Sequence, residues 1–192
     1  MTLDSLDARA LARHGLLERY RADGSRSWLE AAGSSMHPML PAGTHLLVEF
    51  GRAPERIGEV VLFRRGEGLV AHRFVARRTV DGRATFIAKG DGEALADPPI
   101  DPGAVLGVVC EARLRDGRAA PGPLGGLRGE LLAHVSWWCG RTGRASARAA
   151  RRAPAPVHRL VAITALSLSR VPTRVVMALI PRLERGASAE GR

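Results

Sequence analysis

Short apolar runs separated by glycine, proline and aspartate fill the middle of the chain and restrict its fold. Between residues 27 and 115 these runs show no helical period. Runs of this kind are typical of β-strands joined by tight turns. We therefore predict a compact, mainly β domain over residues 25–115, with mostly antiparallel strands. The strands are expected at residues 27–32, 45–50, 59–64, 69–76, 85–88 and 105–113.

Helical patterns flank this β-domain on both sides. Apolar residues recur at helical spacing over residues 2–21, which predicts an amphipathic helix within residues 1–24. Residues 116–125 are expected to form a turn-rich linker. They open a basic C-terminal extension, residues 116–192, that we predict to be partly helical and partly disordered. Its first helix is expected to end near Trp137, with one apolar face formed by Leu127, Leu131, Leu132 and Val135.

Two further segments of the extension differ in composition. Residues 141–156 are mostly Arg, Ala, Gly, Ser and Pro, so they have too few apolar side chains to pack and are expected to be mobile. Residues 157–180 are apolar again but contain Arg170 near their centre. A membrane-spanning helix would bury this arginine at a cost of roughly 2.5–3.5 kcal/mol. Two short interfacial helices broken at Pro172 fit the pattern better.

The excess positive charge lies in the C-terminal part. Residues 1–112 hold 14 basic and 15 acidic side chains, whereas residues 113–192 hold 15 Arg and 4 acidic side chains. This asymmetry is typical of a segment with an anionic partner, or of a solvated tail in an Arg-rich composition. We expect residues 124–181 either to contact an anionic membrane surface or to pack on the β-domain. Nucleic acid is disfavoured as a partner because aromatic side chains, which stack on bases, are only 4% of the chain.

The sequence also bears on location and on metal binding. Asp4, Asp7 and Arg9 would not be tolerated in the apolar segment of a signal peptide, and no uninterrupted apolar stretch reaches the ~20 residues of a membrane span. We therefore expect a cytoplasmic protein, with peripheral contact at the cytoplasmic face of the membrane. Cys110 and Cys139 are too far apart for a metal knuckle, so no metal and no cofactor is predicted.

Three sequence boxes carry candidate chemistry. Gly33-Ser34-Ser35-Met36-His37-Pro38 follows a predicted strand and places a serine hydroxyl on a tight turn. His72-Arg73 lies inside a predicted strand, and Lys89-Gly90-Asp91 is followed by Asp97. A serine, an imidazole and a carboxylate are the groups that nucleophilic acyl transfer uses.

In this order the boxes resemble the signal peptidase I family of serine endopeptidases, over about residues 27–112. The family's nucleophile box is Ser-Met-x-Pro, its base box is Lys or His followed by Arg, and its last box is Gly-Asp with a second Asp six residues later. The matching residues are Ser35-Met36-His37-Pro38, His72-Arg73, and Gly90-Asp91 with Asp97. The resemblance implies a signal-peptidase-like β fold and a serine endopeptidase that cleaves a peptide bond in a precursor protein.

The residue at the base position separates two variants of that family, one with a Lys base and one with a His base. Here it is His72, so the resemblance implies Ser35 as nucleophile, His72 as general base and Asp97 as the carboxylate that orients His72. An imidazole, with an unperturbed pKa of ~6.5, accepts a proton near neutrality without burial. A Ser–Lys dyad using Lys89 is the less favoured alternative.

Asp91, Arg73 and Ser34 are assigned supporting roles by the same resemblance. Asp91 is expected to brace the site by pairing with Arg73 or Lys89. The backbone N–H of Ser35 is expected to form the oxyanion hole. The hydroxyl of Ser34 is a second candidate for this role.

Two other functions stay open. An inert peptidase fold could bind nucleic acid or a membrane through its Arg-rich tail. A self-cleaving regulator would share the fold, but such proteins need a DNA-binding domain and usually a lysine base, which we do not recognise in this chain. Family members that process exported proteins carry a membrane anchor before the serine box. Here only polar-rich residues 1–32 precede it, so we expect a cytoplasmic substrate or membrane contact through the tail.

Overall fold

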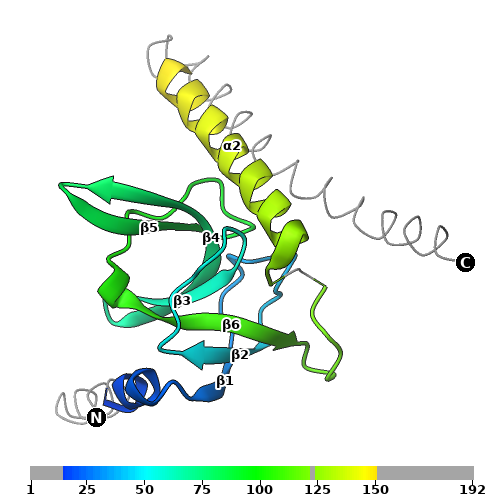
Figure 1. Cartoon of the computed structure of the whole chain (residues 1–192). Coiled ribbons are helices and arrows are strands. Elements are labelled where there is room, and N and C mark those ends of the chain that lie inside the picture. Colours follow the sequence, from blue (N-terminus) through cyan, green and yellow to red (C-terminus); the bar gives the residue numbers. More distant parts are fainter. Residues whose placement is uncertain (1–14, 122–123, 151–192) are drawn as a thin grey trace, which may run out of the picture.

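The computed structural model describes residues 15–121 and 124–150, and their fold is mainly β (Figure 1). Six strands form one antiparallel sheet in the order β1-β2-β6-β3-β4-β5. This confirms the predicted mainly β fold class. The strands are β1 Arg26–Glu30, β2 His45–Phe50, β3 Val60–Arg65, β4 Gly68–Val80, β5 Arg83–Lys89 and β6 Val105–Arg113, with a short 3-10 helix at Pro102–Ala104.

Strands β4 and β5 form a hairpin that is longer than predicted. The apolar pattern ends at residue 76, but β4 continues to Val80 and β5 already begins at Arg83. Asp81 and Gly82 between them both have positive φ, 50° and 75°, as a two-residue hairpin turn requires. The residues near this turn are exposed on both faces, so no alternation of apolar and polar side chains marks them in the sequence.

The sheet curls, which brings distant strands around one cavity. Residues 29–33 at the end of β1 and residues 69–72 of β4 line the same cavity, although three strands lie between β1 and β4 in the sheet. Inside the curl lies the main core, built from buried side chains of β2, β3, β6 and the loop after β1. A second apolar cluster lies on the other face of β3, so this strand is buried on both faces.

The described part of the predicted N-terminal helix, residues 15–23, packs against the sheet. Leu17 is buried in the main core, and the ring of Tyr20 lies 5.3 Å from the ring of Phe50 on β2. Glu18 pairs with Arg64 of β3 at 2.8 Å. Residues 2–14 of the predicted helix lie outside the described residues.

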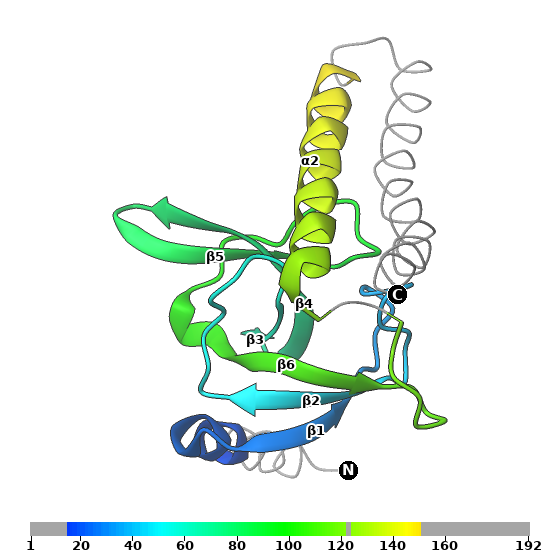
Figure 2. The same cartoon turned by 45° about the vertical axis from the view of Figure 1, so that its right-hand side comes forward.

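Helix α2, Gly126–Ala150, begins beside β4 and extends beyond the sheet (Figure 2). The prediction of a helix from Leu127 to Trp138 is confirmed, but the helix is longer. The prediction that residues 141–156 are mobile is wrong for residues 141–150, which are helical. Alanine and arginine there have high helix propensity, and a helix does not need an apolar face at every turn. The predictions for residues 151–156 and 157–180 lie outside the described residues.

The apolar face predicted for α2 is wrong in part. Leu132 is fully buried, but Leu127 and Leu131 are 86% and 51% exposed. The buried side of α2 is instead formed by Leu132, Ala133 and Ser136. At Gly129 the backbone of α2 approaches Gly58, in the loop before β3, so closely that a Cβ on Gly58 would lie 2.2 Å from Gly129 C. This close contact, which the apolar pattern of the helix does not show, helps to set which side of α2 faces the β-domain.

Membrane crossing is not supported by any described helix. Within residues 15–121 and 124–150, no helix combines the length and the hydropathy that a bilayer crossing needs.

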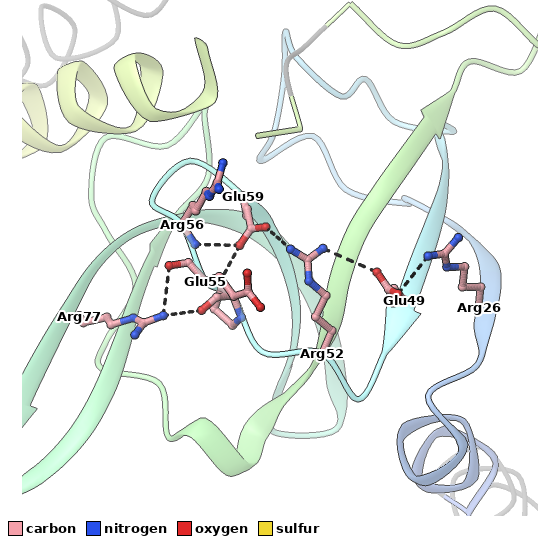
Figure 3. Close-up of polar contacts among 8 residues, drawn as sticks. Arg26, Glu49, Arg52, Glu55, Arg56, Glu59 and Arg77 are labelled. Atoms are coloured by element: carbon pink, nitrogen blue, oxygen red, sulfur yellow. Dashed lines mark hydrogen bonds and ion pairs between the residues drawn. The ribbon is translucent and has the colours of Figure 1, made fainter. Parts of the chain in front are cut away.

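A network of charged side chains connects β1 with the loop before β3 (Figure 3). Arg26 donates to Glu49 at 3.0 Å, and Arg52 lies between Glu49, at 3.6 Å, and Glu59, at 2.5 Å. The Arg26 guanidinium lowers the pKa of the Glu49 carboxyl. The buried carboxylate of Glu59 also accepts two backbone N–H groups of the preceding loop, at 2.8 and 3.1 Å. Glu59 thus holds this loop in place from within.

The different surroundings of Glu59 and Glu49 predict different losses of unfolding free energy on substitution. Glu59→Gln replaces a buried acceptor of three hydrogen bonds and should lower the free energy of unfolding by about 1–3 kcal/mol. Glu49→Gln, its matched control at a more exposed site, should cost less than about 1 kcal/mol. Urea denaturation measures both values. Because the pKa of folded Glu49 is lowered, the loss in Glu49→Gln should shrink as the pH falls through the carboxyl range. Equal losses in the two variants would contradict this account.

Candidate active site

Ser35 lies on a turn that begins a few residues after the end of β1. The neighbouring side chains Met36, Met39 and Leu40 are buried in the main core and anchor the turn. A backbone hydrogen bond from Leu40 to Met36, at 3.0 Å, closes it. With its neighbours fixed in the core, Ser35 is half-buried and lines the cavity.

His72 connects Ser35 to Asp97 through both of its ring nitrogens. Its Nε2 lies 2.8 Å from Ser35 Oγ, and its Nδ1 lies 2.7 Å from Asp97 Oδ2. A carboxylate only accepts, so Nδ1 carries the proton in the neutral ring and Nε2 accepts from the serine hydroxyl. His72 and the side chain of Asp97 are 4% and 8% exposed. The structure therefore brings together the three residues that the sequence singles out.

Arg65 is part of this cluster, and the sequence reasoning missed it. At the end of β3, its guanidinium pairs with Asp97 Oδ1, the oxygen that His72 does not use. Arg65 also lines the cavity, and its guanidinium lies 5.5 Å from the centre of the Phe63 ring. Across the β3–β4 turn, Arg65 pairs with Gly68, the first residue of β4. No motif in the sequence marks it as a partner of Asp97.

The loop after β5 fits tightly against the Ser35 turn. A Cβ on Gly90 would lie 2.6 Å from Ser35 O and 3.0 Å from His72 Nε2. The N–H of Gly92 donates to Ser35 O at 2.8 Å, and a Cβ there would lie 2.7 Å from His37 O. Glycine at both positions therefore lets the loop support the serine and the imidazole from one side.

Arg73 and Asp91 form a fully buried ion pair behind the site. Arg73 donates from Nε to Asp91 Oδ1 at 2.8 Å and from Nη2 to Oδ2 at 2.6 Å. Its Nη1 donates to the carbonyl of Gly58 at 2.7 Å. Each of the two side chains is 1% exposed. Of the two partners that the sequence allowed for Asp91, the structure pairs it with Arg73 in this bidentate contact.

Ser34 is not brought into the site. It is exposed, and it is not among the residues that line the cavity. Its carbonyl accepts the N–H of His37 at 3.0 Å, which places Ser34 in the turn as a backbone element. Gly33, by contrast, lines the cavity next to Ser35.

The cavity beside Ser35 has a volume of about 630 Å³. Its lining combines apolar side chains with the polar side chains of Glu30, Ser35, Arg65, His72, Glu93 and Asp97. A cleft of this size with few convergent polar groups is typical of a ligand site. The apolar lining residues include Leu29, Ala31, Ala32, Met36, Leu40, Leu46, Leu62, Leu69, Val70, Ala71 and Leu95.

The donor set of the described residues gives no indication of a metal. Within residues 15–121 and 124–150, no group of three or more His, Cys, Asp or Glu side chains is placed to hold an ion.

Comparison with known proteins adds no relative. No family model matches the sequence, and no curated protein matches it. The chemistry of the site therefore has to be derived from its own atoms.

The buried pair behind the site predicts a large stability effect. Asp91→Asn leaves the Arg73 guanidinium buried without its carboxylate and should lower the free energy of unfolding by about 3–5 kcal/mol. Glu111→Gln is the matched control, because it breaks an exposed pair with Arg113 and should cost less than about 1 kcal/mol. Urea denaturation measures both. A loss below about 1 kcal/mol in Asp91→Asn would contradict the buried pair.

Proposed function

We propose that this chain is a serine endopeptidase with a signal-peptidase-like core, in which Ser35, His72 and Asp97 form the catalytic triad. The observation that carries the proposal is the unbroken chain of two short hydrogen bonds from Ser35 through His72 to Asp97, three residues that all line one cavity. The match of the three sequence boxes supports the same assignment. The precursor protein that it cleaves would be cytoplasmic or membrane-bound.

The reaction follows from the protonation states of the triad. Ser35 Oγ attacks the scissile carbonyl carbon while its proton passes to His72 Nε2. Asp97 accepts the Nδ1 proton of His72 in a hydrogen bond and stabilises the imidazolium that forms. His72 then returns the proton to the leaving amine, and the acyl group stays on Ser35 as an ester. Water, deprotonated by the same imidazole, hydrolyses the ester and restores the serine hydroxyl.

The other polar groups have assisting roles in this scheme. The backbone N–H of Ser35 is the proposed donor to the oxyanion of the tetrahedral intermediate. Arg65 holds the second oxygen of Asp97, which limits rotation of the carboxylate and keeps its other oxygen directed at His72. The exposed position of Ser34 does not support a role for its hydroxyl in the oxyanion hole.

Two strand edges support an extended peptide as the substrate. In the described part of the chain, β5 pairs with β4 only from Arg73 onward, so residues 68–72 have ladder partners on the β3 side alone. β1 is the first strand of the sheet and pairs only with β2. Both edges border the cavity. An extended peptide could therefore add as a strand between them and present its carbonyl to Ser35.

The triad predicts the loss of peptide cleavage in two variants. Ser35→Ala removes the nucleophile, and Asp97→Asn removes the acceptor that orients His72, so each should lower kcat about 10⁴-fold or more. The measurement is cleavage of an unstructured peptide library by the full chain, together with labelling of Ser35 by a fluorophosphonate.

The neighbouring serine provides the control for this experiment. Ser34→Ala should cleave and label within about threefold of the unaltered chain, because its hydroxyl lies outside the cavity lining. Labelling that moves to Ser34, or cleavage that persists in Ser35→Ala, would overturn the assignment of the nucleophile.

We also propose that the outer side of α2 contacts an anionic membrane surface, which is one of the two alternatives predicted for residues 124–181. Leu127, Leu131 and Trp138 are 86%, 51% and 63% exposed. They share one side of the helix, because Leu131 and Trp138 follow Leu127 by four and eleven residues. Arg141 lies on the same side, 5.8 Å from the centre of the Trp138 ring. Exposed leucine and tryptophan next to arginine are typical of helices that lie at an anionic lipid surface. Residues 151–181 lie outside the described residues.

This surface predicts lipid binding that depends on charge and on two leucines. The full chain should bind vesicles that contain phosphatidylserine more tightly than vesicles of phosphatidylcholine alone, and salt should weaken the binding. The Leu127→Ser/Leu131→Ser variant should bind about tenfold or more weakly, because it loses the apolar contact area. Trp28→Ser, at an exposed tryptophan on β1, is the control and should bind unchanged. No difference between the two variants would contradict the proposal.

A further inference from the structure

We propose that α2 is a positioning element of the active site and that it acts through Ser136 and Lys89. This inference rests on the proposed function. The contact that suggests it joins two buried side chains: Lys89 Nζ at the end of β5 donates to Ser136 Oγ of α2 at 2.6 Å. Both residues are 2% exposed. Among the described residues, those that line the cavity precede α2, so α2 is placed to act on the site through the residues on which it packs.

Lys89 ties the helix to the loop that supports the triad. A buried ammonium needs acceptors, because an unsatisfied charge in the interior is costly. Besides Ser136 Oγ, Lys89 Nζ donates to the carbonyl of Gly90 at 3.3 Å. The ammonium therefore links the carbonyl of Gly90, at the start of the loop after β5, to the hydroxyl of Ser136 on α2.

The same loop lies against the backbone of Ser35 and the imidazole of His72. A Cβ on Gly90 would collide with Ser35 O, at 2.6 Å, and would crowd His72 Nε2, at 3.0 Å. Two residues on, the N–H of Gly92 donates to Ser35 O at 2.8 Å. A displacement of this loop would therefore change the distance between Ser35 Oγ and His72 Nε2.

A second contact of α2 acts on the same loop through other residues. The backbone of α2 at Gly129 meets Gly58 so closely that a Cβ on Gly58 would lie 2.2 Å from Gly129 C. The carbonyl of Gly58 accepts from Arg73, and Arg73 holds Asp91, which directly follows Gly90. Two independent contacts of α2 thus converge on residues 90–91. The helix fixes the loop rather than the substrate.

The closing experiment compares two substitutions on α2 in the full chain. Ser136→Ala removes the acceptor that α2 offers to Lys89 and leaves the helix backbone intact. His134→Ala, on the exposed side of the same helix, is the matched control. Because the substrate touches neither residue, Ser136→Ala should lower kcat about tenfold with KM within about twofold, whereas His134→Ala should leave both unchanged.

A second measurement does not depend on activity. Amide hydrogen exchange at Gly92 reports the hydrogen bond to Ser35 O. It should become about tenfold faster in Ser136→Ala and stay unchanged in His134→Ala. If the unaltered chain neither cleaves peptides nor labels at Ser35, the proposed function fails, while the exchange rate at Gly92 still tests the coupling of α2 to the loop.

A double-mutant cycle tests the path through Lys89. In a Lys89→Met background, Ser136→Ala should change neither kcat nor the exchange at Gly92 any further, because the coupling cation is gone. If Lys89→Met does not fold, the comparison of Ser136→Ala with His134→Ala decides alone. An unchanged kcat and unchanged exchange in Ser136→Ala, or equal effects of both substitutions, would overturn the proposal.

Discussion

The buried guanidinium of Arg73 sets a requirement that the rest of the site has to meet. A charge with no exposure in the interior costs several kcal/mol unless a carboxylate and further acceptors surround it. Asp91 and the carbonyl of Gly58 supply them. Arg73 follows His72 on β4, and Asp91 follows Gly90, where a Cβ would lie 3.0 Å from His72 Nε2. The ion pair on one face of β4 therefore fixes the loop that supports the imidazole on the other face.

The curl of the sheet places the nucleophile next to this support. Ser35 follows the edge strand β1, whereas His72 lies on β4, and the two strands are not neighbours in the sheet. They meet because the apolar residues inside the curl, among them Met36 and Leu62, are buried in one core. The energy of burying that core holds Ser35 Oγ within 2.8 Å of His72 Nε2. The geometry of the triad thus depends on the packing of apolar core residues that take no part in the proposed reaction.

Much of the fold was predictable because each strand is a short apolar run with turn residues at both ends. The bounds of β2 and β6 agree with the predicted ones, since their burial follows their hydropathy. The prediction was less accurate where contacts between distant segments decide. The hairpin of β4 and β5 extends through exposed residues that pair with each other. The buried side of α2 differs from the predicted one because it is set by contacts with distant residues, among them the close approach of Gly129 to Gly58 and the hydrogen bond of Ser136 with Lys89.

By itself, the sequence determined the class of fold, since strand pattern is local, and it supplied the candidate groups of the site through the resemblance of its three boxes to a known family. It named Ser35, His72 and Asp97, and it allowed Arg73 or Lys89 as the partner of Asp91. Only the tertiary structure decided which groups touch. It paired Asp91 with Arg73, brought Arg65 to Asp97, and joined Lys89 to Ser136. Hydrogen bonds and ion pairs act over a few ångströms, and chain folding alone sets such distances between residues far apart in sequence.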